Sequence, residues 1–293
     1  MKNRTREICT SGSVRDEDGQ PPHLLGRRTF LHLAAGAAAL PGVARFAWAQ
    51  TYPTRPVRWI IPFAPGGWAD IVSRIMGSWL SDRLGQPIII ESKPGGGTNI
   101  GTQTVVNSPP DGYTLLWFGS SAAINATFYA TLPFNLQRDI APVAGLADFP
   151  LALVAHPSVP ARTVVELIAY AKAQPGKISM GSFGTGTVSH VAGELFKTRF
   201  DQLADVPTIG DAVPGYEASV WVGVGAPRGT PPEIIERLNR EINAGLVNPT
   251  IKARLAEVAT TPKIFTPAEF GDHMAAEIEK WGRVIKFAGL RAE

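Results

Sequence analysis

The hydrophobic positions beyond residue 51 fall into short, continuous apolar runs that alternate with longer segments of helical periodicity. Short apolar runs bounded by Gly and Pro indicate buried strands, whereas apolar positions spaced three and four apart indicate amphipathic helices. In the first part of the chain, the pattern predicts strands at residues 57–63, 87–92 and 113–119 and helices at residues 70–85 and 96–108. This alternation predicts an α/β fold built around parallel strands that are buried on both faces.

The second part of the chain repeats the alternation and ends in a helical tail. Residues 132–145 are too irregular to assign to an element. Beyond them, the pattern predicts strands at residues 150–157, 177–184 and 219–227, and helices at residues 163–174, 185–200, 231–246, 249–258 and 267–290. The chain therefore contains two sets of alternating elements followed by helices.

Residues 1–49 have the features of an export signal. A twin arginine, Arg27 and Arg28, precedes a small-residue apolar stretch that ends in an A-x-A pattern before Gln50. This arrangement predicts cleavage before Gln50 and export to the periplasm by the twin-arginine pathway. A membrane anchor is the alternative, but proline, histidine and arginine interrupt the stretch, and no later window has about 18 consecutive apolar residues. We therefore expect a mature chain that is not embedded in the membrane.

Charge and cysteine content exclude several classes of protein. The net charge is +3, but residues 1–49 hold seven of the 28 Lys/Arg and four of the 25 Asp/Glu, so the remainder is neutral. No basic run favours nucleic acid. Cys9 is the only cysteine and lies within the predicted signal, which excludes disulfides, iron–sulfur clusters and thiolate metal sites from the mature chain. With 44% hydrophobic and 18% charged residues, the composition is that of a globular protein.

Two Gly-rich loops, Pro65 to Asp70 and Gly181 to His190, each connect a predicted strand to a predicted helix. A helix N-terminus presents unpaired backbone N–H groups at its positive end and favours an anion, and glycine lets a ligand approach the backbone closely. Two such loops facing each other could hold both ends of a dicarboxylate. Alternatively, the glycines only form tight turns.

Residues around the first loop also allow two interpretations each. Asp70 either complements the helix dipole and caps a local N–H, or orients loop groups and water around a ligand. Phe63 and Trp68 could form an apolar wall, although aromatic residues at the end of a strand are more often part of the core. The sequence leaves these alternatives open.

Other ligands and catalysis have less support. Neither loop contains the G-x-x-x-x-G-K-[ST] phosphate motif, and the glycine spacing in residues 95–101 departs from the dinucleotide fingerprint. His190 and Glu194 share a helix face but have no further metal ligand, and a helix-surface pair is the commoner interpretation. Neither a G-x-S-x-G nor an H-E-x-x-H motif is present. We therefore expect no cofactor, no metal and no enzymatic activity.

Four stretches of sequence, in this order, resemble a known family: "YPTRPVRWIIPFAPGGWADIVSR", "GGGTNIGTQTVVNSPPDGYTLL", "HPSVPARTVVELIAYAKAQPGKISMGSFGTGTVSHVAGELF" and "DVPTIGDAVPGYEASVWVGVGAPRGTPPEIIERLN". They are similar to the periplasmic solute receptors of tripartite tricarboxylate transporters, the Bug-type family. Together with the tail, they cover most of residues 51–293. The resemblance implies a monomeric α/β protein of two-lobed, Venus flytrap architecture that serves subunits of a membrane transporter.

The resemblance also implies a division of the chain and a site. Lobe 1 takes residues 50–146, lobe 2 takes residues 147–221, and residues 222–293 return to lobe 1 and add the C-terminal helices. The ligand's carboxylates would be met by backbone amides, hydroxyls and waters of the loop after the first strand and of its counterpart in lobe 2. The implied ligand-binding residues are Phe63, Pro65, Gly66, Gly67, Trp68, Asp70, Ser120, Ser182, Gly184, Thr185, Gly186, Thr187 and His190.

The chain departs from the family after Phe200. Members usually continue through further strands and helices of the second lobe before the "DVPT" segment, which here follows almost directly. We therefore expect a shortened second lobe. The sequence predicts a periplasmic receptor for an organic mono- or dicarboxylate. The alternative is a secreted sensor or interaction protein, or a degenerate receptor, whose lobe no longer binds a solute.

Overall fold

The computed structural model describes residues 52–198 and 219–291 of the protein. The predicted export signal and the "DVPT" segment lie outside these residues. Among the described helices, none has the length and apolar character needed to cross a membrane.

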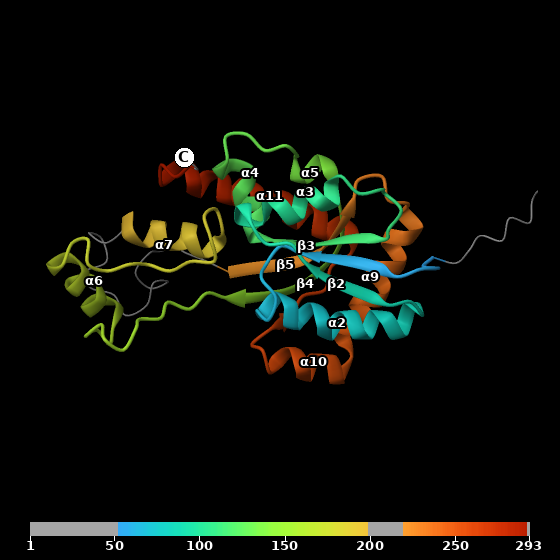
Figure 1. The fold of residues 1–293 in the computed structure, drawn as a ribbon, viewed down its shortest axis with the longest axis horizontal. Coiled ribbons are helices and arrows are strands. Elements are labelled where there is room, and N and C mark those ends of the chain that lie inside the picture. Colours follow the sequence, from blue (N-terminus) through green and yellow to red (C-terminus); the bar gives the residue numbers. More distant parts are fainter. Residues whose placement is uncertain (1–51, 199–218, 292–293) are drawn as a thin grey trace, which may run out of the picture. The chain divides into compact units, whose positions relative to one another are not determined.

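One mixed sheet forms the centre of the fold, with strand order β2-β1-β3-β5-β4-β6 (Figure 1). The strands are β1 (Val57–Ile61), β2 (Ile88–Ser92), β3 (Thr114–Gly119), β4 (Ile140–Pro150), β5 (Ser219–Pro227) and β6 (Thr261–Pro262). Strand β1 pairs in parallel with β2 and β3, as the alternating pattern predicted. The pairs β3–β5, β4–β5 and β4–β6 are antiparallel. The prediction of a sheet built around parallel strands is therefore correct for only three of the six.

Helices cover both faces of this sheet. The described helices are α2 (Trp68–Leu84), η1 (Gly96–Thr98), α3 (Asn99–Val106), α4 (Ser120–Phe128), α5 (Leu136–Asp139), α6 (Val164–Ala173), α7 (Val188–Thr198), α9 (Pro232–Val247), α10 (Pro249–Ala256) and α11 (Pro267–Phe287), and α6 does not lie on the sheet (Figure 1). Figure 1 shows α2 and α10 on one side of the sheet and α3, α4 and α11 on the other. Helix α2 buries Val72, Met76 and Leu80, which lie four residues apart on one face. It ends at Gly85, whose left-handed φ of 72° suits glycine.

The core lies between the sheet and these helices. Trp59 and Trp117, on neighbouring strands, are fully buried with ring centroids 6.0 Å apart. Glu277 of α11 is also buried, and its carboxylate accepts hydrogen bonds from the indoles of Trp221 at 2.9 Å and Trp281 at 3.0 Å. Two donors from the core thus pair with this carboxylate, whose burial without a partner would cost free energy.

Three predictions about strands are wrong. Residues 177–184 form no strand, and of residues 150–157 only Pro150 belongs to one. That strand, β4, begins at Ile140, inside the segment that the pattern left unassigned. A strand needs a partner, and β4 finds it in β5 of the central sheet. Strand β2 is not buried on both faces, since it lies at the sheet edge and leaves Ile89 48% exposed.

Candidate functional site

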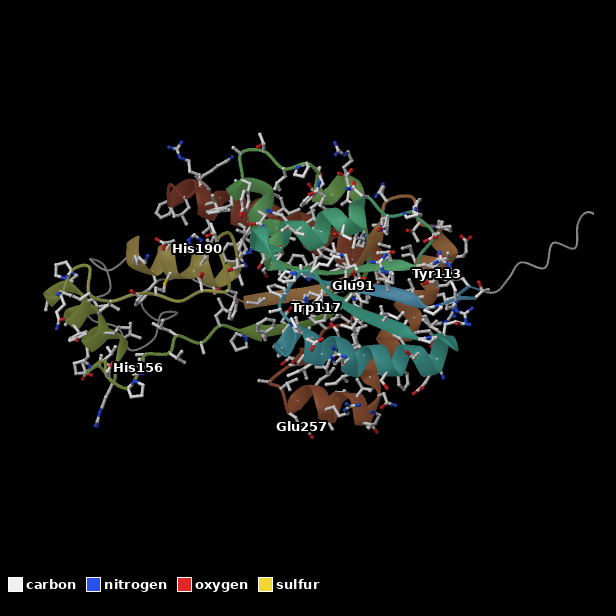
Figure 2. The ribbon with its side chains drawn as sticks, viewed as in Figure 1. Glu91, Tyr113, Trp117, His156, His190 and Glu257 are labelled. Carbon is white, nitrogen blue, oxygen red and sulfur yellow. The ribbon has the colours of Figure 1, made fainter. Side chains whose placement is uncertain are left out.

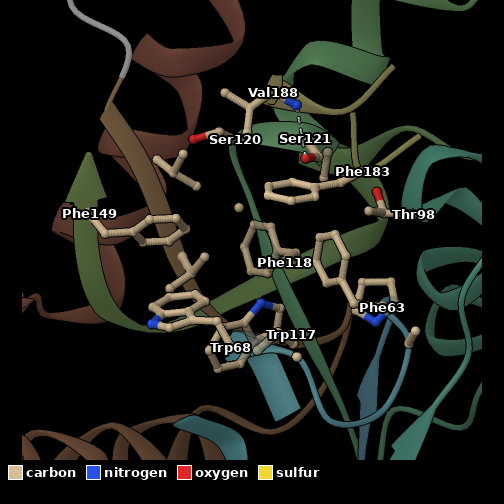
Figure 3. Close-up of a pocket in the computed structure, with 18 residues that line it drawn as sticks. Phe63, Trp68, Thr98, Trp117, Phe118, Ser120, Ser121, Phe149, Phe183 and Val188 are labelled. Atoms are coloured by element: carbon tan, nitrogen blue, oxygen red, sulfur yellow. Dashed lines mark hydrogen bonds between the residues drawn. The ribbon is translucent and has the colours of Figure 1, made fainter. Parts of the chain in front are cut away.

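A cavity of about 400 Å³ lies at the carboxyl ends of β1 and β3, where parallel α/β sheets usually bind ligands (Figure 3). It is bordered on one side by the ends of β4 and β5. Its wall is formed by Pro62, Phe63, Ala64, Gly67, Trp68, Ala69, Thr98, Trp117, Phe118, Gly119, Ser120, Ser121, Ala122, Phe149, Phe183, Val188, Val220 and Val222. These residues come from both sides of the predicted lobe boundary.

The first turns of three helices contribute to this wall: α2 with Trp68 and Ala69, α4 with Ser120, and α7 with Val188. The residues before α2 and α4 are Gly67 and Gly119, and neither provides a side-chain cap. The first backbone N–H groups of these helices thus receive no capping acceptor from those positions. Helix N-termini of this kind carry partial positive charge and bind anions.

Two serine hydroxyls at the start of α4 lie in the same part of the wall. Ser120 Oγ accepts a hydrogen bond from the backbone N–H of Trp221 at 3.0 Å. Ser121 Oγ accepts one from the N–H of Val188 at 3.3 Å, which joins α7 to α4 (Figure 3). Because each oxygen already accepts a backbone proton, its own hydroxyl proton remains available to a ligand.

Two further polar groups of the wall have no hydrogen-bond partner among the described residues: Thr98 Oγ1 and Trp117 Nε1. Thr98 is 5% exposed and Trp117 is fully buried. Figure 2 shows Trp117 within the central sheet. A buried polar group without a partner costs about 1–3 kcal/mol, so a ligand atom that pairs with it recovers this free energy. Both residues line the cavity, but these two atoms are themselves buried, so a ligand reaches them only if the wall shifts.

The remaining wall is largely aromatic. The indole N–H of Trp68 donates to Thr260 Oγ1 at 2.8 Å and to the Val258 carbonyl at 3.2 Å, which fixes the ring. Its centroid lies 4.0 Å from that of Phe149 and 5.6 Å from that of Trp117. Figure 3 shows Trp68 and Trp117 on the opposite side of the cavity from the serines.

Asp70 is buried but does not line the cavity. Its carboxylate accepts a hydrogen bond from the backbone N–H of Gly66 at 2.9 Å and pairs with Arg74 at 3.0 Å. The hydrogen bond from Arg74 lowers the pKa of Asp70 below its usual value, and the Gly66 N–H acts in the same direction. These contacts stabilise the first loop and agree with the interpretation in which Asp70 caps a local N–H.

The structure separates the predicted site residues into two groups. Phe63, Gly67, Trp68 and Ser120 lie in the cavity wall. The others lie outside it: Pro65, Gly66, Asp70, Ser182, Gly184, Thr185, Gly186, Thr187 and His190. The second loop instead contributes Phe183 and Val188 to the wall.

The polar residues of the second loop mainly bond within the loop. Thr187 Oγ1 donates to the Gly184 carbonyl at 2.6 Å, and His190 Nδ1 accepts from the Gly186 N–H at 3.4 Å. His190 lies on α7 (Figure 2). A Cβ atom at Gly186 would lie 2.5 Å from Asn125 Oδ1 of α4. These residues therefore shape the loop and fit it closely against α4.

The metal alternative gains no partner ligands. Glu194 pairs with Lys197 at 2.5 Å, and in the part of the chain that the structure describes no group of three His, Cys, Asp or Glu side chains could hold a metal.

Sequence reasoning missed Thr98, Trp117 and Ser121. Ser121 follows Ser120 at the start of α4, a helix that the hydrophobic pattern did not reveal.

Comparison with known proteins identifies the family. The sequence profile of the tripartite tricarboxylate transporter family receptors matches residues 72–202 and 195–290. The chain belongs to this family. BugT of Bordetella pertussis is 31% identical over 310 residues, which cover 86% of this chain and 95% of BugT. A second B. pertussis protein, of the UPF0065 type, is 41% identical over 59% of this chain and 54% of its own length.

Solved structures of similar proteins have the same fold as this chain. R. palustris Rpa4515, determined with adipate, has a TM-score of 0.76 and 29% identity, over 82% of this chain and 99% of its own. The periplasmic binding protein BugD has a TM-score of 0.77 and 23% identity, over 83% and 100%. The receptor thus has the α/β fold of periplasmic binding proteins, as the resemblance implied.

Proposed function

We propose that this receptor binds a small organic carboxylate in the periplasm and delivers it to a tripartite tricarboxylate-type membrane transporter. Membership of the receptor family supports the transport role. The features of residues 1–49 support export by the twin-arginine pathway. We place the lobes at residues 50–146 and 147–221, with the return to lobe 1 at 222–293, and we propose that the receptor acts as a monomer without a cofactor.

The cavity is the observation that carries the carboxylate assignment. The N-termini of α2, α4 and α7 border one space, together with the hydroxyls of Ser120 and Ser121. Backbone N–H and hydroxyl groups donate to carboxylate oxygens and, unlike Lys or Arg, do so without carrying a full charge. The adipate in the Rpa4515 structure is a carboxylate of suitable size for such a cavity.

A degenerate receptor is the second candidate, and the shortened lobe favours it. The family profile matches in two pieces that meet at residues 195–202, and the BugT alignment of 310 residues is longer than this chain of 293. Both observations support a gap in this chain, and the two pieces of the profile match place it near the end of α7. When a lobe lacks part of its sheet, its loop becomes ordered only on binding. This ordering costs about 1–2 kcal/mol of conformational free energy per fixed residue. Such a lobe closes weakly on a solute.

Substitutions at Gly67 test the carboxylate assignment. Gly67 has φ of −81°, which proline tolerates, and a Cβ atom there meets only the Ala64 carbonyl at an ordinary 3.6 Å. Gly67→Pro removes one backbone N–H, whereas Gly67→Ala retains it. Losing a hydrogen bond to a charged group costs about 1.5–3 kcal/mol. We therefore expect Gly67→Pro to weaken the binding of adipate, whose second carboxylate would lie at the α2 N-terminus, by about tenfold or more, and Gly67→Ala to retain nearly wild-type affinity.

Isothermal titration calorimetry with adipate and benzoate measures these affinities, and native mass spectrometry of gently purified protein detects a retained solute. Equal affinities in the two variants would exclude the N-terminus of α2 as a carboxylate contact. If neither method finds any carboxylate bound to the wild type, the degenerate receptor is the correct alternative.

A further inference from the structure

The cavity wall contains an unusual proportion of aromatic rings. Six of its eighteen residues are aromatic: Phe63, Trp68, Trp117, Phe118, Phe149 and Phe183. Trp68 is held in place by its hydrogen bond to Thr260 and by its contact with Phe149. Fixed aromatic faces and edges favour a ligand ring, because aromatic pairs gain about 0.5–1.5 kcal/mol beyond their buried area.

None of the eighteen wall residues carries a charge. A ligand ammonium would therefore meet no carboxylate in the wall, and leaving a buried charge unpaired is costly. The nearby Asp70 is already bonded to Gly66 and Arg74. A second ligand carboxylate on the aromatic side would likewise meet no Lys, Arg or His in the wall.

The polar groups are not spread evenly around the cavity. Ser120, Ser121 and the N-terminal residue of α7, Val188, lie on one side, whereas Trp68 and Trp117 lie on the opposite side (Figure 3). One end of the cavity thus offers two hydroxyls and the N-terminus of α4 to an anion, whereas the other end offers ring surfaces beside the N-terminus of α2. A ligand that matches this arrangement has one carboxylate and an apolar body.

Phe183 adds an observation from the second loop. It borders the cavity, although its side chain is 70% exposed. Its backbone N–H donates to Ser189 Oγ at 3.0 Å, which ties it to the start of α7. An exposed aromatic ring at the edge of an apolar cavity gains when a ligand covers it, because apolar surface leaves water.

We propose that the solute is an arene carboxylate, in which the carboxylate binds at the N-terminus of α4 and the hydroxyls of Ser120 and Ser121, and the ring packs against Trp68, Phe149 and Phe183. This inference rests on the proposed receptor function and specifies its solute. It ranks amino acids below aromatic monocarboxylates, because their ammonium finds no partner among the wall residues that the structure describes. It also ranks straight-chain dicarboxylates below aromatic monocarboxylates.

A calorimetric series on the mature wild-type protein tests this order. Benzoate and cyclohexanecarboxylate have the same number of heavy atoms and the same charge, and they differ in aromaticity. Adipate tests the second carboxylate, and L-phenylalanine tests the ammonium. We expect benzoate to bind about tenfold more tightly than cyclohexanecarboxylate and adipate, and L-phenylalanine to bind more weakly than benzoate.

The outcomes separate this inference from the proposed function. If adipate or cyclohexanecarboxylate binds as tightly as benzoate, the arene inference is wrong and the carboxylate receptor stands. Tight binding of L-phenylalanine also overturns the inference. If no carboxylate of the series binds, both proposals fail.

A pair of exposed phenylalanines provides a matched test by mutation. Phe183→Leu removes a ring from the cavity edge, and Phe287→Leu makes the same change on α11 outside the wall, where Phe287 is 69% exposed. The melting temperatures of the two variants show whether either change disturbs the fold. We expect Phe183→Leu to weaken benzoate binding by about threefold to tenfold while adipate binding stays within twofold, and Phe287→Leu to change neither. Equal loss of both ligands in Phe183→Leu, or no loss, contradicts the ring contact.

Discussion

At the scale of single residues, Thr98 combines two unfavourable features beside the cavity. Its φ is 87°, a left-handed conformation that β-branched residues rarely adopt, and its buried Oγ1 has no partner among the described residues. Strain and unsatisfied polar groups of this kind cluster where proteins bind ligands. Sequence reasoning could not find this residue, because neither a torsion angle nor a missing partner is visible in a pattern of residue types.

Thr98→Val tests whether this hydroxyl contacts the solute. Valine has the same shape, so removing an unsatisfied hydroxyl is expected to leave the free energy of unfolding unchanged or raise it by up to about 1–3 kcal/mol. We expect the affinity for benzoate to fall by about fivefold if a hydrogen bond is lost. Calorimetry and thermal unfolding measure the two effects.

Thr102 provides the control, since its buried hydroxyl donates to the Thr98 carbonyl at 3.1 Å. Thr102→Val is therefore expected to show the opposite result, with lower stability and unchanged affinity. An unaltered affinity in Thr98→Val would mean that the ligand does not reach this residue.

At the scale of elements, the loop before α2 depends on one carboxylate. In the folded chain the bond from Arg74 lowers the pKa of Asp70, so this group adds stability above its unfolded pKa of about 3.9. That stability is lost as the pH falls below this value and through the lower, folded pKa. The Arg74 side chain is largely exposed, so solvent screening weakens its contribution to this stability.

We therefore expect the melting temperature of the wild type to fall as the pH decreases below about 4, through the linkage of protonation to unfolding. Asp70→Asn should melt lower at pH 7 and show a shallower decrease in acid. Parallel pH profiles for the two proteins, recorded by thermal unfolding without ligand, would show that Asp70 does not stabilise this loop.

The elements also show which parts of the fold were predictable. Strands β1 and β3 and helices α2, α9 and α11 follow apolar runs or helical periodicity, because local pattern and tertiary burial agree there. Residues 150–157 and 177–184 also contain apolar positions between Gly and Pro, yet neither forms a strand beyond Pro150. Pairing depends on which other strands are present, and this information does not lie in the segment itself.

The candidate site was predictable to a similar degree. The sequence selected the first loop because glycine between a strand and a helix has a direct chemical meaning, and Gly67 and Trp68 of this loop line the cavity. In the second loop the same argument selected hydroxyls such as Thr187, which in the fold bonds to Gly184. A donor motif in a sequence does not reveal whether its protons point into a cavity or back to the loop.

At the scale of the whole molecule, the central sheet and the described part of the predicted second lobe differ in how their backbone is bonded. Strands β1 and β3 have paired backbones and are almost fully buried. Residues 151–163 and 174–187 belong to no described helix or strand, and Val154 is 85% exposed. Segments with few backbone hydrogen bonds open at low free-energy cost.

Hydrogen exchange measures this difference directly. We expect amides of residues 151–163 and 174–187 to exchange faster than those of β1 and β3, with α6 between the two. Benzoate is expected to slow exchange around Phe183 and Val188 and to leave residues 151–163 unchanged. Protection of residues 151–163 equal to that of β1 would mean that they pair with a strand after all.

Two tryptophans of the cavity wall, Trp68 and Trp117, give the protein a built-in optical reporter. The indoles of Trp221 and Trp281 already donate to Glu277, and that of Trp68 to Thr260, whereas the buried indole of Trp117 has no partner among the described residues. The emission of an indole shifts to longer wavelength when its N–H gains an acceptor. Occupancy of the cavity can therefore be followed by the intrinsic fluorescence of the unlabelled chain, with Trp68 and Trp117 as the indoles that border the solute.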